Sequence, residues 1–121
     1  MGQVMPLPNV FGDAEAPYLR RARLVEAARK GDWSKLPDIG AYLKSKDRDE
    51  IFAASLVRLL RSCPRQDKWP MILSAMDDPS PLVRSAAAET LSENPSEKAH
   101  RALVKATGDE YRLVRVRAVA A

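Results

Sequence analysis

The chain has 121 residues and a formal net charge of +4, and 45% of its residues are hydrophobic and 30% are charged. This length fits one compact domain or one stretch of a longer array, and this composition is typical of a folded protein and not of a disordered one. The single cysteine excludes an internal disulfide, and no apolar run approaches the ~20 residues of a transmembrane helix.

The chain begins with residues 1–13, which contain prolines and a glycine and show no helical period. This predicts an extended N-terminal arm, because proline and glycine interrupt regular structure. The segment has no basic region followed by a hydrophobic core, so it does not resemble a secretory signal. A capping helix is predicted over 14–31, where apolar residues recur at helical spacing and Gly31 provides the stop.

Short helices separated by regular breaks follow the capping helix. The breaks read SKDRD, CPRQD, DDPS, ENPS and TGDE, and most combine a helix stop with a polar residue that can cap the next helix. Few residues are aromatic, and β-branched residues do not alternate, which also favours helices. The predicted helices span about 33–44, 50–62, 68–76, 81–93 and 97–106, and a last helix begins near Tyr111.

Comparison of the chain with itself at an offset of 31 residues indicates an internal repeat. Residues of one type recur in three triplets: Asp47, Asp78 and Asp109; Ile51, Leu82 and Leu113; and Phe52, Val83 and Val114. We therefore predict a single repeat domain over 14–121. Behind the capping helix we place repeats at about 32–62, 63–93 and 94–121, and we expect the last of them to be truncated.

The repeated segments resemble the HEAT-repeat family in its short bacterial form, which is related to phycobilisome-lyase-type repeats. DPSPLVRSAAAETL and DEYRLVRVRAVAA follow the family pattern of a turn with Asp and a helix that opens with an apolar pair and Arg. DRDEIFAASLVRLL departs from it at Ala53, where the others have Arg84 and Arg115. The resemblance implies an all-α, right-handed superhelix, an α-solenoid of about three two-helix repeats behind a capping helix.

A second resemblance concerns YLRRARLVEAARKGDWSKLPDIGAYL and the repeats after it. Together they are similar to the repeat tail that follows the haem-binding part of some bacterial multihaem c-type cytochromes. No Cys-x-x-Cys-His motif occurs, so this chain attaches no c-type haem itself. We expect a cytoplasmic location by default and a periplasmic one if the chain is such a tail.

Two Asp–Arg combinations are the most prominent charged candidates: Asp78 with Arg84, and Asp109 with Arg115. Each Asp precedes a helix, where a carboxylate can accept hydrogen bonds from free N–H groups and meet the positive end of the helix dipole. Each Arg lies about one and a half turns into the following helix. The resemblance implies that these residues form a structural ladder between neighbouring turns.

We predict no catalytic, cofactor-binding or metal-binding residues. The only histidine, His100, is far in sequence from the only cysteine, Cys63, so no set of ligands has metal-site spacing. No glycine-rich phosphate loop or Ser–His–Asp order is present. Trp33 and Trp69 each open a first helix of a repeat and are expected to pack against a neighbouring unit.

Stacked two-helix units bury a continuous core and are expected to present one broad concave surface made by the second helices. Helical spacing predicts that a buried set lies on these helices: Phe52, Leu56, Leu59, Leu60, Val83, Ala86, Ala87 and Leu91. It predicts an outward surface for a partner, formed by Val57, Arg58, Arg61, Ala88 and Glu89. Arg117 stands in the register of inward-facing Ala86, which suggests that the last helix lies at a boundary.

The sequence therefore predicts a non-enzymatic scaffold or docking module for another protein or another domain of the same chain. A cytochrome tail that supports redox partners is one alternative, and a nucleic-acid-binding repeat is another. The basic segments YLRRAR and LVRVR are interspersed with acids along the chain, which disfavours nucleic acid. No membrane insertion is expected.

Overall fold

The computed structural model describes residues 17–94 and 96–120, and all regular structure in these ranges is helical. The arm predicted for 1–13 lies outside the described residues. The helices, in chain order, are α2 Pro17–Lys30, η2 Trp33–Lys35, α3 Leu36–Leu43, α4 Glu50–Leu59, η3 Leu60–Ser62, α5 Lys68–Ala75, α6 Pro81–Leu91, α7 Glu97–Ala106 and α8 Arg112–Ala120.

Two of the predicted helices contain a short 3-10 segment (η). Near Trp33 the chain first forms η2, whose start is capped by Asp32, and α3 then begins with Pro37 in its first turn. The helix that ends near Ser62 tightens into η3 before the extended backbone of Cys63. Pro64 explains this end, because the residue before a proline disfavours helical geometry.

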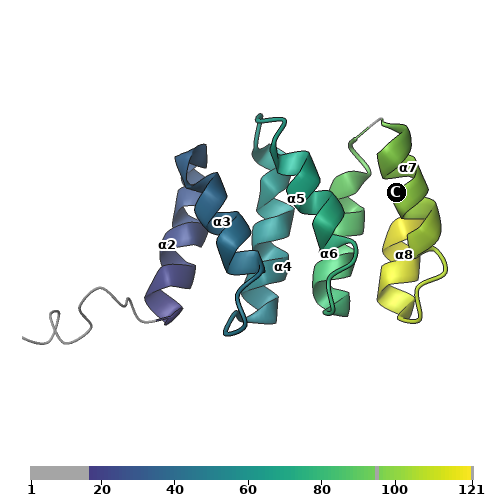
Figure 1. Cartoon of the computed structure of the whole chain (residues 1–121), viewed down its shortest axis with the longest axis horizontal. Coiled ribbons are helices and arrows are strands. Elements are labelled where there is room, and N and C mark those ends of the chain that lie inside the picture. The colour runs from purple at the N-terminus through teal and green to yellow at the C-terminus, as the bar shows by residue number, and fades with distance from the viewer. Residues whose placement is uncertain (1–16, 95, 121) are drawn as a thin grey trace, which may run out of the picture.

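The helices form two layers (Figure 1). In one layer α4 packs beside α2 and α6, and α6 packs beside α8. The other layer consists of α3, α5 and α7, which stand further apart from one another. The chain is thus an all-α solenoid in which one helix layer is closely packed and the other is spread.

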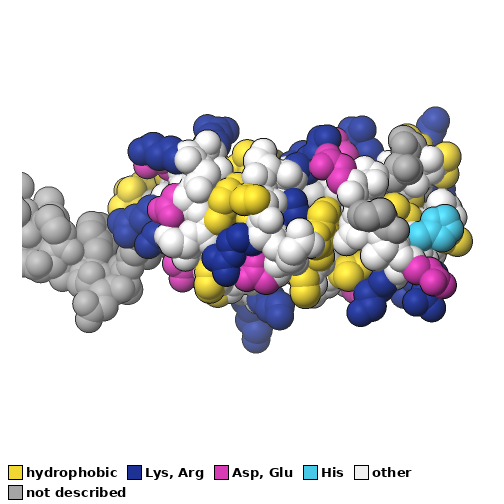
Figure 2. Space-filling view, turned by 90° about the horizontal axis from the view of Figure 1, so that it is seen from above, with side chains coloured by type: hydrophobic (Ala, Val, Ile, Leu, Met, Phe, Trp, Pro, Cys, Tyr) yellow, Lys and Arg dark blue, Asp and Glu magenta, His cyan; other side chains and the backbone are white. Residues whose placement is uncertain are grey.

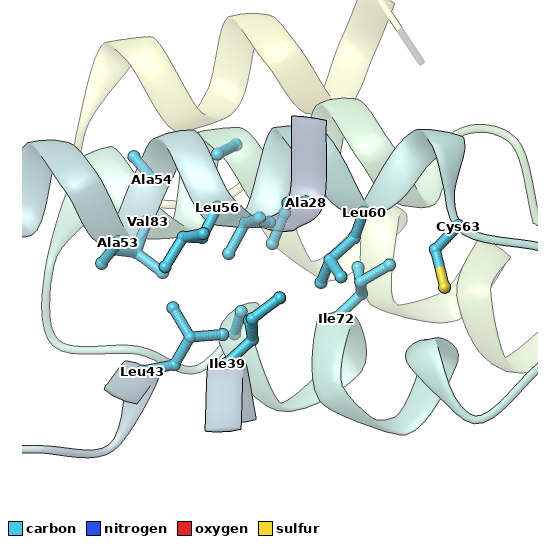
Figure 3. Close-up of a cluster of buried hydrophobic side chains, with 14 of the residues drawn as sticks. Ala28, Ile39, Leu43, Ala53, Ala54, Leu56, Leu60, Cys63, Ile72 and Val83 are labelled. Carbon is cyan, nitrogen blue, oxygen red and sulfur yellow. The ribbon is translucent and has the colours of Figure 1, made fainter. Parts of the chain in front are cut away.

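The core lies between the two layers. Ile39 of α3 and Ile72 of α5 are fully buried against Leu56 of α4 and Leu60 of η3 (Figure 3). Leu36 of α3 is buried in the same core cluster. In α6 the small residues 86–88 are all buried, which lets α6 approach the helices on both sides. A continuous apolar core between stacked units is the main source of stability in repeat folds.

Local signals fix the helix ends. Gly31 has φ 78°, the left-handed conformation that ends α2 at a glycine. Asp49 accepts hydrogen bonds from the N–H groups of Ile51 and Phe52 and so caps α4. The hydroxyl of Ser80, which precedes α6, makes no cap; it donates to Glu50 Oε2 at 3.2 Å.

A buried lysine stabilises the turn between α4 and α5. Lys68 Nζ donates to the carbonyl of Cys63 at 2.6 Å and lies 4.5 Å from the centre of the Trp69 ring. The ammonium group therefore meets carbonyl oxygens at a helix C-terminus, where positive charge is favoured. Trp33 is buried and Trp69 packs partly buried against the core, so both indole rings serve packing between units.

Candidate functional site

The first two repeats are joined by Arg48 and Asp78. The guanidinium of Arg48, in the turn before α4, makes two hydrogen bonds to the Asp78 carboxylate, in the turn before α6, with Nη1–Oδ2 at 2.7 Å. Both side chains are only 11% exposed. Arg48 Nη1 also donates to the carbonyl of Leu43 at 2.6 Å. Such two-pronged Arg–carboxylate pairs fix geometry as well as contributing energy.

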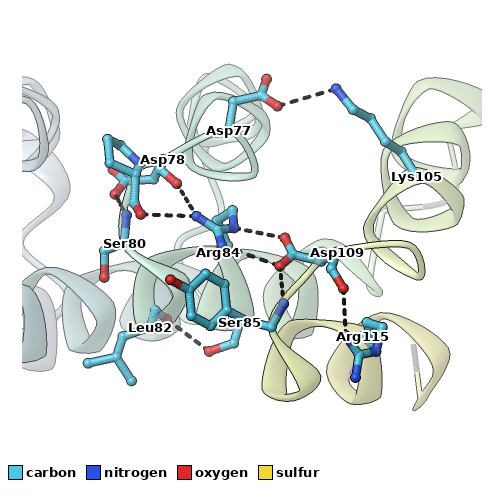
Figure 4. A network of polar contacts seen from close by, with 11 residues as sticks. Asp77, Asp78, Ser80, Leu82, Arg84, Ser85, Lys105, Asp109 and Arg115 are labelled. Atoms are coloured by element: carbon cyan, nitrogen blue, oxygen red, sulfur yellow. Dashed lines mark hydrogen bonds and ion pairs between the residues drawn. The ribbon is translucent and has the colours of Figure 1, made fainter.

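Arg84 makes the corresponding link one repeat later (Figure 4). Its Nε and Nη2 donate to the Asp109 carboxylate at 2.8 and 3.3 Å, and its Nη1 donates to the backbone carbonyl of Asp78 at 2.8 Å. Arg115 donates to the carbonyl of Asp109 at 2.8 Å in the same way. We call Arg48, Asp78, Arg84, Asp109 and Arg115 the turn ladder.

The ladder is connected differently from the two combinations singled out in the sequence. The carboxylate of Asp78 binds Arg48, and Arg84 reaches past it to Asp109. Ala53 leaves the first repeat without an arginine at the family position, and Arg48 provides the guanidinium from the preceding turn instead. This substitution has no counterpart in the 31-residue register, so the spacing of the repeats could not predict it.

The two ladder carboxylates are held in the charged form. Burial by itself raises the pKa of Asp78. Hydrogen bonds from Arg48 and the Ser80 N–H and the positive charges of Arg48 and Arg84 lower it by more, so the pKa of Asp78 lies below its ordinary value. At Asp109 burial is likewise outweighed, by Arg84, the Tyr111 N–H and the charge of Arg115, and the pKa is lowered.

The predicted partner surface contains two residues that cannot contact a partner. Val57 and Ala88 are both 0% exposed. Val57 belongs to the main core, and Ala88 packs with Val114 and Ala118 of α8. The prediction assumed that a second helix buries one face, but α4 and α6 each have a neighbour on both sides as well as the core beneath. Their buried faces are therefore wider than the sequence pattern indicates. Two residues of the predicted buried set, Phe52 and Leu59, are only half-buried, at positions where they pack against the core.

The arginines of the predicted surface pair with acids of the next repeat. Arg58 Nε lies 3.2 Å from Glu89 Oε2, and Arg61 Nε lies 2.7 Å from Glu93 Oε2. The first pair connects α4 to α6, and the second connects η3 to the turn that follows α6. Their side chains are partly exposed, so each pair contributes at most about 1 kcal/mol to stability.

An exposed apolar row lies on the closely packed layer at the opposite ends of these helices. Ile51, Leu82 and Leu113 stand in register in α4, α6 and α8 and are 68%, 37% and 41% exposed. Their neighbours Val83 and Val114 are buried. Two consecutive helical residues point about 100° apart, so only one of each apolar pair can face the core. That rule was the signal by which the sequence could have identified this exposed row.

The histidine, the cysteine and the last-helix arginine singled out in the sequence do not form a metal site among the described residues. His100 is exposed, and Cys63 is a buried free thiol. Within residues 17–94 and 96–120, no three His, Cys, Asp or Glu side chains are grouped as a metal site would need. None of the helices described is both long and apolar enough to cross a membrane. Arg117, which is in the register of Ala86, is exposed on α8.

The basic segment of α2 is engaged with aromatic rings. The guanidinium of Arg20 lies 5.5 Å from the ring centre of Tyr42, and that of Arg21 lies 5.0 Å from the ring centre of Phe52. Such cation–π contacts attach α2 to α3 and α4. These two arginines therefore contribute to packing between helices.

Comparison with known proteins gives one family match, which covers most of the chain. Residues 36–121 match the family described as HEAT repeats. The match begins at α3 and includes the turn ladder and the exposed row. Neither the curated proteins nor the solved structures yielded a match.

Proposed function

The chain belongs to the HEAT-repeat family, and from this premise we propose that it is a non-catalytic scaffold that docks a folded protein. The partner is another protein or another domain of the same chain. We place the contact on the exposed row of Ile51, Leu82 and Leu113. Arg58 and Glu89, near the C-terminal ends of α4 and α6, and Arg61 of η3 form its polar border. Val57 and Ala88 are no longer part of it.

The observation that carries this proposal is the register of the exposed row. A single exposed leucine or isoleucine needs no explanation, because apolar atoms make up much of any protein surface. Here the same position is apolar and exposed on three adjacent helices. Packed helices lie 8–10 Å apart, so the row extends over roughly 20 Å. That span suits a contact with a protein surface better than a small ligand, which needs a deep pocket.

The turn ladder helps to fix the positions of the residues in the exposed row. Asp78 and Asp109 stand in the turns directly before the helices that carry Leu82 and Leu113. Arg48 and Arg84 fix the spacing of these turns, so the apolar side chains are presented at fixed positions before a partner arrives. A rigid surface loses little conformational entropy on binding, which favours affinity.

The charge pattern supports a protein partner over nucleic acid. On the face seen in Figure 2, basic, acidic and hydrophobic side chains are interspersed over the helices. Nucleic-acid surfaces gather lysine and arginine on one face or stripe. If the chain is the repeat tail of a multihaem cytochrome, its partner would be a redox partner that binds the same surface. The same capture experiment therefore tests this alternative.

The test is capture of partners from the native cell by the intact chain, with crosslinking. We expect Ile51→Ser/Leu82→Ser/Leu113→Ser to lose proteins that the wild type retains. The matched control is Val104→Ser/Val116→Ser/Val119→Ser, which alters exposed apolar residues outside the row. Circular dichroism checks that both variants fold. Equal capture by the wild type and the row variant would contradict the proposal.

A further inference from the structure

A groove lies between α5 and α7 in the spread helix layer. It has a volume of about 1120 Å3 and is open to solvent. Leu73 and Met76 from α5 and its C-cap and Ala102 from α7 form its apolar floor. These three side chains are half-buried against the core, so each keeps an exposed apolar part. The groove is separate from the exposed row, which belongs to α4, α6 and α8.

One wall of the groove is basic. Lys98, Arg101 and Lys105 line it from successive turns of α7. Spacings of three and four residues place these side chains on one face of a helix. All three are exposed. Lys105 lies 3.7 Å from Asp77 across the groove, and both side chains are more than three-quarters exposed (Figure 4).

The other charges of the groove are largely neutralised by the turn ladder. Asp78 is paired with Arg48, and Asp109 with Arg84. In the part of the chain that the structure describes, Lys98 and Arg101 have no carboxylate within ion-pair distance. The unpaired positive charges of the groove, Lys98 and Arg101, therefore lie in the N-terminal half of α7. Glu110, which forms no ion pair with the described residues, lines the groove beyond the C-terminal end of α7.

We propose that this groove binds a short segment of a partner protein that carries apolar side chains and, next to them, several carboxylates. The apolar side chains cover Leu73, Met76 and Ala102, and the carboxylates meet Lys98 and Arg101. This inference rests on the proposed docking function and names the chemistry of a second contact. Charge complementarity fixes both the acidic character of the segment and its direction, with its acidic end toward the start of α7.

The arrangement has the parts of a peptide-binding groove. Apolar anchors in a groove supply most of the binding energy, and peripheral charges add specificity and speed of association. Because the basic side chains are exposed, salt should screen them, and affinity should fall as ionic strength rises. A purely apolar segment would leave Lys98 and Arg101 without partners and would show little dependence on salt.

The test is selection of a displayed library of short random peptides on the intact chain, followed by fluorescence anisotropy with the enriched peptides. We expect enriched sequences to combine apolar residues with a run of Asp or Glu. Lys98→Glu/Arg101→Glu should weaken their binding about tenfold or more, equal to about 1.4 kcal/mol. Ser74→Trp, at an exposed position in the groove, should block binding by filling it.

The matched control is Arg29→Glu/Lys46→Glu, which makes the same charge change at exposed positions outside the groove. It should bind like the wild type. No enrichment, enriched peptides without acids, or unchanged binding by the Lys98/Arg101 variant would each overturn the proposal. If binding were instead lost in the Ile51/Leu82/Leu113 variant, the groove would be excluded and the docking function would stand. If the row variant captured partners like the wild type while the peptides bound the groove, only the placement of the docking contact on the exposed row would fail.

Discussion

Arg84 holds two turns of the solenoid at once: its Nε and Nη2 bind the carboxylate of Asp109 and its Nη1 binds the carbonyl of Asp78. The two aspartates occupy the same position of successive repeats. One guanidinium therefore fixes the distance between neighbouring units, and Arg48 does the same one repeat earlier through Asp78. Side chains thus join the repeats through polar contacts as well as through the core.

The first prediction concerns the connectivity of the ladder. In a double-mutant cycle, Arg84→Ala and Asp109→Ala should show a coupling of about 0.5–3 kcal/mol, because the two charged groups are in contact and 13% exposed. Arg84→Ala with Asp78→Ala should couple less, because Arg84 contacts only the backbone of Asp78. Urea denaturation measures both couplings. A larger coupling for Arg84 with Asp78 would contradict the connectivity described here.

The second prediction concerns pH. The pKa of Asp109 is lowered in the folded chain, so its charged form contributes stability above the pKa of an unfolded aspartate, about 3.9. This contribution is lost as the pH falls through the lower folded pKa. Asp109→Asn should therefore reduce the melting temperature at pH 7, and the difference from the wild type should shrink toward pH 2. The same should hold for Asp78→Asn.

The control for this series is Asp77→Asn, because the Asp77 side chain is 76% exposed and its contact with Lys105 is weak. Its melting temperature should stay close to that of the wild type at both pH values. If the melting-temperature difference between Asp109→Asn and the wild type grew toward low pH, the charged form of Asp109 would not stabilise the fold as proposed.

The helices could be predicted from the sequence because their ends depend on local chemistry. Proline in the first turn of α3 and α6, Gly31 after α2 and the cap at Asp49 all act within a few residues of a helix end. The 31-residue register then indicated the repeat, and the family match agrees with it. Each of these signals is readable without knowing which helices are neighbours.

The surface was harder to predict because it depends on those neighbours. Val57 and Ala88 look outward on an isolated helix and are buried only because α2, α6 and α8 stand beside α4 and α6. The pairing of Arg48 with Asp78 joins turns 30 residues apart and replaces an arginine that is missing at Ala53. Neither fact follows from the spacing of residues within one repeat.

The third prediction separates the core from the exposed row. Leu56 is fully buried between the layers, so Leu56→Ala should reduce the free energy of unfolding by about 2–5 kcal/mol. Ile51→Ala, five residues earlier on the same helix, should change it by less than about 0.5 kcal/mol because the side chain is mostly exposed. Chemical denaturation gives both values. Similar losses for the two variants would show that Ile51 is covered in solution.

The fourth prediction concerns the charge pairs between α4 and α6. Arg58→Glu alone places two acids together and should cost up to about 1 kcal/mol, the scale of a partly exposed pair. Adding Glu89→Arg should restore most of this loss, because the pair is then reversed. Melting temperatures of the single and double variants test the contact. If the second substitution gives no recovery, Arg58 and Glu89 do not interact in solution.

The last prediction addresses the nucleic-acid alternative. A basic surface that neutralises several phosphates releases counterions, so its affinity falls steeply with salt. Here Arg58 and Arg61 are paired with acids, and Arg20 and Arg21 lie over aromatic rings. These four guanidinium groups would have to leave their contacts to reach a phosphate. We therefore expect no micromolar binding of a labelled DNA duplex at about 0.15 M salt. Binding at that salt concentration, lost on Arg58→Glu/Arg61→Glu, would favour the nucleic-acid function over protein docking.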